Sequence, residues 1–309
     1  MVLRENPHGK PSFERKNVLE MLTVFTPTYN RAQTLPRLYR SLLQQTCMDF
    51  EWLVVDDGSL DETASLLAEW VKESKFTVRY IQKENGGKYR AYNVGLREAK
   101  GELFFCVDSD DWLPPHSVER IMEQKELLDV TSNIAGFIAL KDYANGEIIG
   151  NPFHCKETKT TLFHLEEIGE GGERSLVFKT SIARQYPFPE ETHEKFLTES
   201  VIYDRYHPYY QFHIINQPLC TCEYQTDGLS SNPQRLMVQN PSGYKLYFSQ
   251  RIDLESGLFA RLKNAIKYHA FRVLSHSSVF PYKGKHQCLV RLTYPLGNVF
   301  AIIYKLKTR

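Results

Sequence analysis

The sequence lacks any apolar run long enough to cross a bilayer. Its longest late hydrophobic stretch, residues 299–304, falls far short of the roughly 20 apolar residues that a transmembrane helix needs. The start of the chain is polar, with Pro7, Gly9 and Pro11, and does not show the apolar core of a signal peptide. We therefore expect a cytosolic protein.

Paired cysteines are also missing. The six cysteines, at positions 47, 106, 155, 220, 222 and 288, show no disulfide framework, which favours a reducing compartment. Cys220 and Cys222 have the spacing of half a metal site, but no second pair with matching spacing accompanies them. We therefore expect free thiols.

Two common phosphate-binding motifs are absent. Neither G-x-G-x-x-G nor G-x-x-x-x-G-K-[ST] follows any predicted strand, which argues against a dinucleotide-binding fold and a P-loop protein. No repeats or low-complexity tracts occur. With 309 residues, 42% hydrophobic and 24% charged, the chain can form one domain of roughly 200 residues plus an accessory piece.

Acidic residues are scarce at the end of the chain. Residues 251–309 hold eleven Lys or Arg and two acids, Asp253 and Glu255, a net charge of +9 in a chain whose total is +1. Basic residues interleaved with apolar ones suit the anionic inner face of a membrane. Packing on the rest of the protein or homo-oligomerisation would use the same residues. No nucleic-acid-binding module accompanies the charge, so we expect no nucleic-acid partner.

Four strand-turn-helix units fill the first part of the chain. The predicted strands cover residues 22–26, 50–55, 78–82 and 103–107, and helix-periodic apolar residues follow each one. This alternation predicts an α/β fold with a Rossmann-like, mostly parallel wound sheet and helices on both faces. Ligands of such sheets bind beyond the carboxyl ends of the strands.

A capping box, Ser59-x-x-Glu62, is expected to start the second helix.

The later chain carries weaker signals. Near the end, apolar residues recur every fourth position from Leu254 to Leu274, which predicts one helix. We expect an N-terminal leader at residues 1–20, the sheet domain at 21–235 and a basic, partly helical C-terminal extension at 236–309.

Three carboxylates crowd the end of the fourth predicted strand. Asp108, Asp110 and Asp111 lie within four positions, and such charges in a cleft either take up protons or hold a cation. Their oxygen atoms suit Mn²⁺ or Mg²⁺ that carries phosphate groups. A solvated Asp-rich turn would show the same pattern. Asp111 is a third ligand, a partner of a ligand, or the cap of the next helix, and we favour the cap.

The other strand ends also carry polar turns. The first has Thr28, Tyr29 and Arg31, the second Asp56 and Asp57, and the third residues 84–88. Each turn alone is common. Four of them at one edge of one sheet indicate a nucleotide site.

Taken together, these turns resemble family 2 glycosyltransferases of the GT-A fold. The motifs are T-P-T-Y-N-R (26–31), V-V-D-D-G-S-x-D (54–61), E-N-G-G-K (84–88) with A-Y-N-V-G (91–95), and V-D-S-D-D-x-L-x-P (107–115). The resemblance covers about residues 21–125. It implies inverting transfer of a sugar from a UDP-sugar to an acceptor hydroxyl, assisted by Mn²⁺ or Mg²⁺. It further implies work on a glycan or lipid-linked acceptor in bacterial surface polysaccharide synthesis, in the cytoplasm or on the inner face of the membrane.

The resemblance also implies residue roles. Asp57 would accept a hydrogen bond from the uracil N3–H, which suits an acceptor-only carboxylate. Lys88 would contact the base or the phosphates. Asp108, with Ser109, would lie near the ribose, and Asp110 together with Asp108 would hold the metal. Pro27, Thr28, Tyr29 and Arg31 would border the nucleoside.

An inverting transfer needs a base opposite the leaving group. Relatives supply it from a Glu-Asp or Thr-Glu-Asp motif, whereas this chain reads Thr198-Glu199-Ser200, so Glu199 is the candidate base. The missing Asp keeps open a catalytically silent sugar-nucleotide-binding subunit, and a nucleotidyltransferase on a similar sheet is a third hypothesis. The competing carboxylates are Glu190, Glu191, Glu194 and Asp204. His193, His207 and His213 are metal candidates for which we expect ordinary roles.

Overall fold

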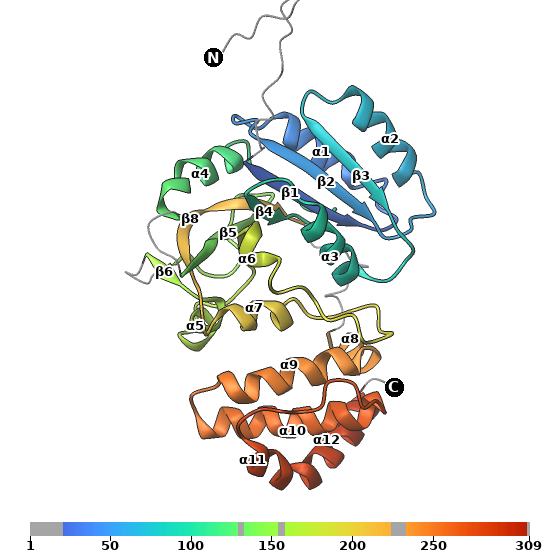
Figure 1. Ribbon diagram of the computed structural model, residues 1–309, viewed down its shortest axis with the longest axis vertical. Coiled ribbons are helices and arrows are strands. Elements are labelled where there is room, and N and C mark those ends of the chain that lie inside the picture. Colours follow the sequence, from blue (N-terminus) through green and yellow to red (C-terminus); the bar gives the residue numbers. More distant parts are fainter. Residues whose placement is uncertain (1–20, 129–132, 154–157, 224–232, 308–309) are drawn as a thin grey trace, which may run out of the picture.

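A computed structural model describes residues 21–128, 133–153, 158–223 and 233–307 (Figure 1). The expected leader at residues 1–20 lies outside the described residues. The strands are β1 (Leu22–Thr28), β2 (Phe50–Asp56), β3 (Thr77–Gln82), β4 (Leu103–Cys106), β5 (Ile134–Tyr143), β6 (Lys159–Thr160), β7 (Ser175–Lys179) and β8 (Gln211–Cys222). The helices are α1 (Leu35–Leu43), α2 (Thr63–Glu73), α3 (Lys88–Glu98), α4 (Ser117–Glu123), the 3₁₀ turn η1 (Lys125–Leu128), α5 (Leu162–Glu167), α6 (Thr180–Ala183), α7 (Ser200–Tyr206), α8 (Pro233–Gln239), α9 (Pro241–Leu254), α10 (Leu258–Ser275), α11 (Gln287–Leu292) and α12 (Tyr294–Lys307).

The strands form one sheet in the order β3-β2-β1-β4-β7-β5-β8-β6. The first four predicted strands pair in parallel, so their carboxyl ends meet at one edge, with Thr28 opposite Asp56 and Asp56 opposite Gln82. β7 pairs antiparallel with both β4 and β5, and β5 pairs parallel with β8. The predicted α/β fold with a mostly parallel sheet is confirmed.

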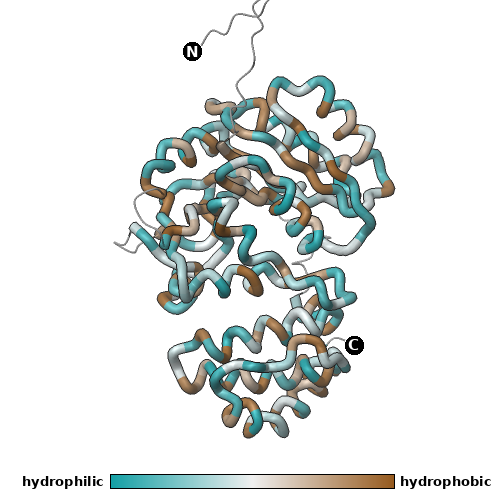
Figure 2. Tube along the Cα trace, viewed as in Figure 1, coloured by the Kyte–Doolittle hydropathy of each residue, from teal (hydrophilic) through white to brown (hydrophobic). Residues whose placement is uncertain are grey.

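Both faces of the sheet are covered, which explains why β1 and β2 are buried along their whole length. On one face Val24 and Trp52 pack with α1 and α2, and on the other Phe25 packs with α3. Hydrophobic residues accordingly run along these strands in Figure 2. Because successive side chains of a strand point to opposite faces, each strand contributes to two hydrophobic cores, one on either face of the sheet.

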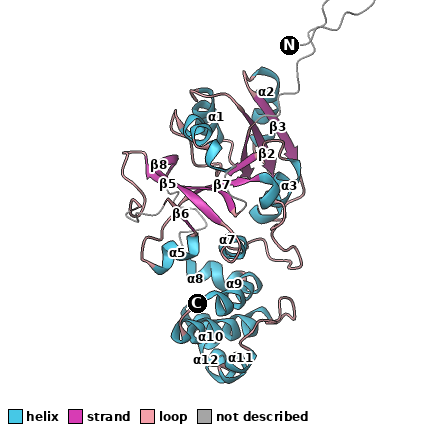
Figure 3. Cartoon of the chain, turned by 60° about the vertical axis from the view of Figure 1, so that its left-hand side comes forward, coloured by secondary structure: helices cyan, strands magenta, loops and turns pink. Residues whose placement is uncertain are grey.

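A layer of helices, α8 to α12, lies beyond α7 on the side away from β3 (Figures 1 and 3). α9 contacts α7, and α10 packs against α9 and α12. The single helix predicted across Leu254–Leu274 is wrong, because the backbone is extended at Glu255 and Gly257 and separates α9 from α10. As a result Leu258 is 70% exposed and does not pack.

Candidate active site

The turn after β2 is held by Asp56. Its carboxylate accepts hydrogen bonds from the Ser59 backbone N–H (2.8 Å), the Ser59 hydroxyl (2.6 Å) and the Tyr80 hydroxyl (3.0 Å). The predicted capping box is therefore wrong, because Ser59 donates to Asp56 and α2 begins at Thr63 without a side-chain cap. The Asn30 backbone N–H donates to the Ser59 hydroxyl at 2.8 Å, which ties the first polar turn to the second.

Asp57 fixes the loop between β3 and α3. Its two carboxylate oxygens accept from Lys83 Nζ (2.6 Å), Asn85 Nδ2 (3.2 Å) and the backbone N–H groups of Gly86 (2.9 Å) and Gly87 (2.7 Å). Only 4% of Asp57 is exposed. The structure thus gives Asp57 a loop-holding role, and its contact with a uracil base stays a prediction.

Gly87 lets two distant loops meet. Its φ is +100°, and a Cβ there would lie 1.9 Å from the carbonyl oxygen of Lys195. A side chain is excluded on both counts. Nearby, the Tyr89 hydroxyl donates to the carbonyl of Glu194 at 3.0 Å. These contacts hold the segment before α7 against the start of α3.

Lys88, Asp108 and Glu199 come together at this junction. Lys88 Nζ lies 2.7 and 2.9 Å from the two oxygens of Asp108 and 2.7 Å from Glu199 Oε1. Burial alone would lower the pKa of Lys88, but the charges of Asp108 and Glu199 outweigh it and hold the pKa well above its usual value. The structure therefore unites three residues predicted from separate parts of the sequence.

Asp110 is the least compensated carboxylate of the D-x-D turn. Burial, together with the charge of Asp108, raises the pKa of Asp110. Burial also acts to raise the pKa of Asp108, yet Lys88 and Lys141 bring it below its usual value. Arg31 stabilises the negative charge on both carboxylates. A divalent cation beside Asp110 would relieve the remaining repulsion.

Asp111 is not a helix cap, since His116 occupies that position before α4. Its Oδ2 accepts from the thiols of Cys222 (3.1 Å) and Cys220 (3.5 Å) and lies 3.3 Å from Lys141 Nζ. The Asp111 carboxylate oxygen and the two thiol sulfurs lie within 4.8 Å of one another, so they could hold a metal. Lys141, however, already supplies a positive charge there. Asp111 thus anchors the turn to β8. Sequence reasoning missed Lys141, which lies near the end of an apolar strand without a motif.

Comparisons with known proteins bear on this site directly. The family model described as glycosyl transferase family 2 matches residues 23–167. These residues, slightly less than half of the chain, match that family. The match contains the polar turns after β1, β2, β3 and β4, and it ends before Glu199.

Curated relatives match this glycosyltransferase domain in part. Glycosyltransferase GlyA of Streptococcus pneumoniae is 34% identical over 163 residues, which cover 53% of this chain and 21% of that protein. Glycosyltransferase GlyG of the same species is 32% identical over 119 residues, covering 38% of this chain and 39% of that protein. This chain thus spans less than half the length of these relatives.

Solved structures share the fold over most of the chain. Staphylococcus aureus TarS 1–349 in complex with UDP has a TM-score of 0.58 at 19% identity, covering 93% of this chain and 88% of that chain. The mannosyltransferase PcManGT from Pyrobaculum calidifontis, in complex with GDP-Man and Mn²⁺, has a TM-score of 0.52 at 17% identity, covering 93% and 82%. The predicted GT-A fold is confirmed.

The other carboxylates near Glu199 in sequence are engaged elsewhere in the protein. Glu194 accepts from the backbone N–H groups of Ser242 (2.7 Å) and Gly243 (2.9 Å) at the start of α9. Asp204 pairs with Arg251, Glu190 accepts from Asn93 Nδ2 at 2.6 Å, and Glu191 is exposed. Of these candidates, Glu199 alone forms an ion pair with Lys88, the partner of Asp108, among the described residues.

The histidines and the remaining predicted residues also have places. His207 lies 2.8 Å from the Thr161 hydroxyl, and His213 lies 3.1 Å from the Leu127 carbonyl. His193 is exposed. Pro27, Thr28 and Ser109 are buried, Tyr29 is 44% exposed and Arg31 is half-buried.

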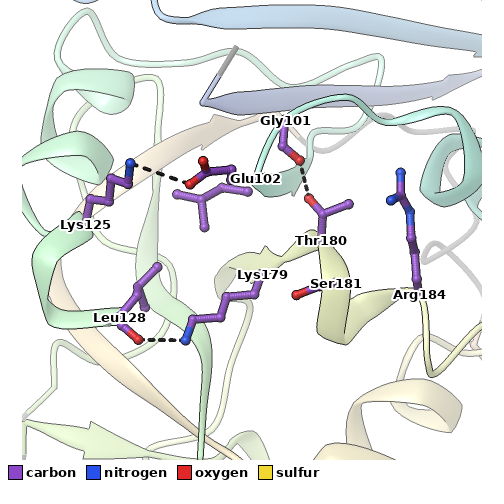
Figure 4. Close-up of a pocket in the computed structure, with 9 residues that line it drawn as sticks. Gly101, Glu102, Lys125, Leu128, Lys179, Thr180, Ser181 and Arg184 are labelled. Carbon is purple, nitrogen blue, oxygen red and sulfur yellow. Dashed lines mark hydrogen bonds and ion pairs between the residues drawn. The ribbon is translucent and has the colours of Figure 1, made fainter. Parts of the chain in front are cut away.

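A pocket at the opposite edge of the sheet is a different feature (Figure 4). It lies at the amino end of β4, beside Glu102, Lys125 and Lys179. Lys125 pairs with Glu102 at 3.5 Å, and Lys179 donates to the Leu128 carbonyl at 2.6 Å. Ligands of parallel sheets bind at the carboxyl ends, so this pocket is not the predicted site.

Proposed function

We propose that this glycosyltransferase moves a sugar from a UDP-sugar to an acceptor hydroxyl with inversion at the anomeric carbon. The observation that carries the proposal is the meeting of Lys88, Asp108 and Glu199 next to Asp110, at the edge where parallel sheets bind ligands. The carboxylates of Asp108 and Asp110 suit a metal-bound diphosphate, and the carboxylate of Glu199 suits proton removal.

The nucleoside would lie over the turns after β1 and β2. Tyr29 is exposed there and offers a ring to a base or ribose. The buried Thr28 hydroxyl has no hydrogen-bond partner among the described residues, which leaves its donor unused. The UDP bound in the TarS structure supports a uridine donor, although the identity shared with that protein is low.

The carboxylates of Asp108 and Asp110 fit Mn²⁺ or Mg²⁺, because both offer hard oxygen ligands and Asp110 keeps an uncompensated charge. When bound there, the ion would stabilise the negative charge of the diphosphate leaving group. The Mn²⁺ in the PcManGT structure supports this assignment. Lys88 would add a positive charge beside the same phosphates.

Glu199 would act as the base. It precedes α7 directly, and its side chain is 45% exposed, so an acceptor hydroxyl can reach it. By taking the proton of that hydroxyl, Glu199 would raise the nucleophilicity of the attacking oxygen. Lys88 would hold Glu199 in its orientation until the acceptor arrives.

The acceptor would be a glycan or a lipid-linked sugar in bacterial surface glycan synthesis. A relative described as an undecaprenyl-phosphate 4-deoxy-4-formamido-L-arabinose transferase, 33% identical over 113 residues, supports a lipid-linked acceptor. Another described as chondroitin synthase, 34% identical over 104 residues, supports a polysaccharide. The five described cysteines are free, which agrees with work in the cytoplasm.

A thermal-shift screen of UDP, GDP and their sugars, with and without Mn²⁺, tests the donor. A ligand that binds only the folded state raises its melting temperature. We expect uridine compounds with Mn²⁺ to give the largest rise, and Asp110→Asn to reduce the metal-dependent part. If no uridine compound raises the melting temperature, the UDP assignment is wrong.

Product analysis separates the alternatives. The proposed enzyme releases UDP and a glycoside, whereas a nucleotidyltransferase would release diphosphate and an activated sugar. Ser200, which stands where the resemblance implies an Asp, keeps a silent binding subunit as the alternative. Such a subunit would bind the donor and release no product with any acceptor.

A further inference from the structure

The end of the chain exposes an unusual amount of apolar surface. Among the described residues, eight of the eighteen large apolar side chains that are exposed lie between Leu292 and Leu306. Isolated exposed apolar residues are ordinary, but a contiguous set marks an interaction surface. This set belongs to the end of α11 and to α12, at the tip of the molecule remote from the sheet (Figures 1 and 3).

Helix α12 has two distinct apolar faces. Gly297 and Ala301 are buried against α10, and a Cβ at Gly297 would lie 2.2 Å from the Cβ of His269. That face is closed by tight packing. The second face is formed by Leu296, Val299, Ile303 and Leu306, which are 51%, 54%, 39% and 63% exposed.

The spacing of these four residues places them on one stripe. Positions i, i+3, i+7 and i+10 fall on the same side of an α-helix, and here that side is opposite Gly297 and Ala301. We call these four residues the α12 stripe. Because α10 covers the other face, the fold itself leaves the stripe pointing outward.

The charge around the stripe selects the partner. From Ser256 to Lys307 the chain has nine Lys or Arg and no Asp or Glu. Lys283, Lys285, Arg291 and Lys307 are exposed on the same helical layer. A second copy of this chain would bring two positive surfaces together, whereas anionic lipid headgroups would attract them.

We propose that the α12 stripe docks the protein on an anionic membrane surface. The aliphatic side chains enter the boundary between headgroups and acyl chains, and exposed Lys and Arg of the helical layer contact the headgroups. No helix among the described residues has the length and apolarity to span a membrane, so docking takes place in the plane of the surface. This inference does not rest on the proposed sugar transfer, because vesicle binding is measured without a donor.

The test is co-sedimentation of the full chain with phosphatidylcholine vesicles that contain or lack about one-third phosphatidylglycerol. We expect binding to the anionic vesicles, weakened by salt. The variant L296S/V299S/I303S/L306S should lower the partition coefficient at least about tenfold, since each side chain removed is apolar area lost from the lipid. Its melting temperature should not change, because all four side chains are exposed.

A matched control replaces two exposed apolar residues of the sheet domain, Val71→Ser and Leu127→Ser. This variant should sediment like the unchanged protein. Equal sedimentation of the stripe variant and the unchanged protein would overturn the proposal, and so would equal binding to neutral vesicles. Sedimentation equilibrium supplies the remaining arm: a concentration-dependent oligomer that the stripe variant abolishes, without vesicle binding, would assign the stripe to a second copy of the chain.

Discussion

Two triads, each with one cation between two carboxylates, occupy different environments in this protein. In the site triad Lys88 lies between Asp108 and Glu199, and the three side chains are 32%, 38% and 45% exposed. In the clamp triad Arg251 lies between Asp204 and Glu166, and the side chains of Arg251 and Asp204 are only 8% and 2% exposed.

The two cations also differ in geometry. Arg251 binds Asp204 through Nε (2.5 Å) and Nη2 (2.9 Å) and Glu166 through Nη1 (2.6 Å), and it lies over the rings of Phe163 and Tyr247. Such a planar fork fixes its partners in one arrangement. Lys88 is a point charge on a flexible stem, which allows its partners to be exchanged for a ligand.

This difference assigns different tasks to the two triads. A half-exposed ion pair is cheap to break, so Asp108 and Glu199 can turn to a metal, a phosphate or an acceptor. Removal of one partner from a buried pair lowers the stability of the folded protein by several kilocalories per mole. The clamp also supports the site, because Asp204 lies on α7, the helix that Glu199 directly precedes, while Arg251 comes from α9. The helical layer thereby positions the candidate base.

The largest expected effect comes from Glu199→Gln. The amide keeps the shape of the side chain but cannot take a proton, so turnover should fall by about 10² to 10⁴. Donor affinity, measured by thermal shift with UDP-sugar, should remain. Glu191→Gln, an exposed neighbour on the same segment, is the control and should leave turnover unchanged. Full activity of Glu199→Gln would remove it as the base.

Replacing the cation of each triad with methionine tests whether the two triads differ in their contribution to stability. Arg251→Met leaves Asp204 buried and unpaired, so urea unfolding should show a loss of about 3–5 kcal/mol. Lys88→Met removes a half-exposed pair, and the loss should stay within about 1 kcal/mol while turnover falls. Arg251→Lys should recover part of the stability. Equal losses for the two methionine variants would mean that the triads do not differ as their burial indicates.

The first half of the fold could be predicted because its signals are local. Each parallel strand is a short apolar run that ends at a polar turn, and β1 to β4 lie within two residues of the predicted bounds. The local signal failed where a side chain had a second partner. Ser59 looks like a helix cap but binds Asp56, and Asp111 looks like a cap but binds two thiols and Lys141.

The second half could not be predicted because its contacts are long-range. The sequence indicates Lys88 and Glu199 separately, but their meeting depends on α3 packing against the segment before α7, where Gly87 touches Lys195. Nothing local shows that β7 inserts between β4 and β5, or that Arg251 reaches Asp204. The prediction of a single helix across Leu254–Leu274 failed for the same reason, since tertiary packing selects which face of α10 is buried.

The smallest expected effect is a pH dependence of the clamp. Burial raises the pKa of Asp204 from 3.8 to about 6 in the folded protein, against the opposing charge of Arg251. The folded state then takes up a proton as pH falls through 6, while the unfolded state does so only near 3.8. This contribution to the free energy of unfolding is full below 3.8 and is lost as pH rises through 6. Between pH 7 and pH 5 it should amount to about 1 kcal/mol.

Urea unfolding of the unchanged protein and of Asp204→Asn at both pH values isolates this contribution, because the amide does not titrate. The difference in stability between the two proteins should shift in favour of the unchanged protein at pH 5. A shift of the opposite sign would mean that Arg251 lowers the pKa of Asp204 and that its charge outweighs burial. The clamp would then resemble the site triad, where Lys88 and Lys141 lower the pKa of Asp108 despite burial, and its distinct role would rest on geometry alone.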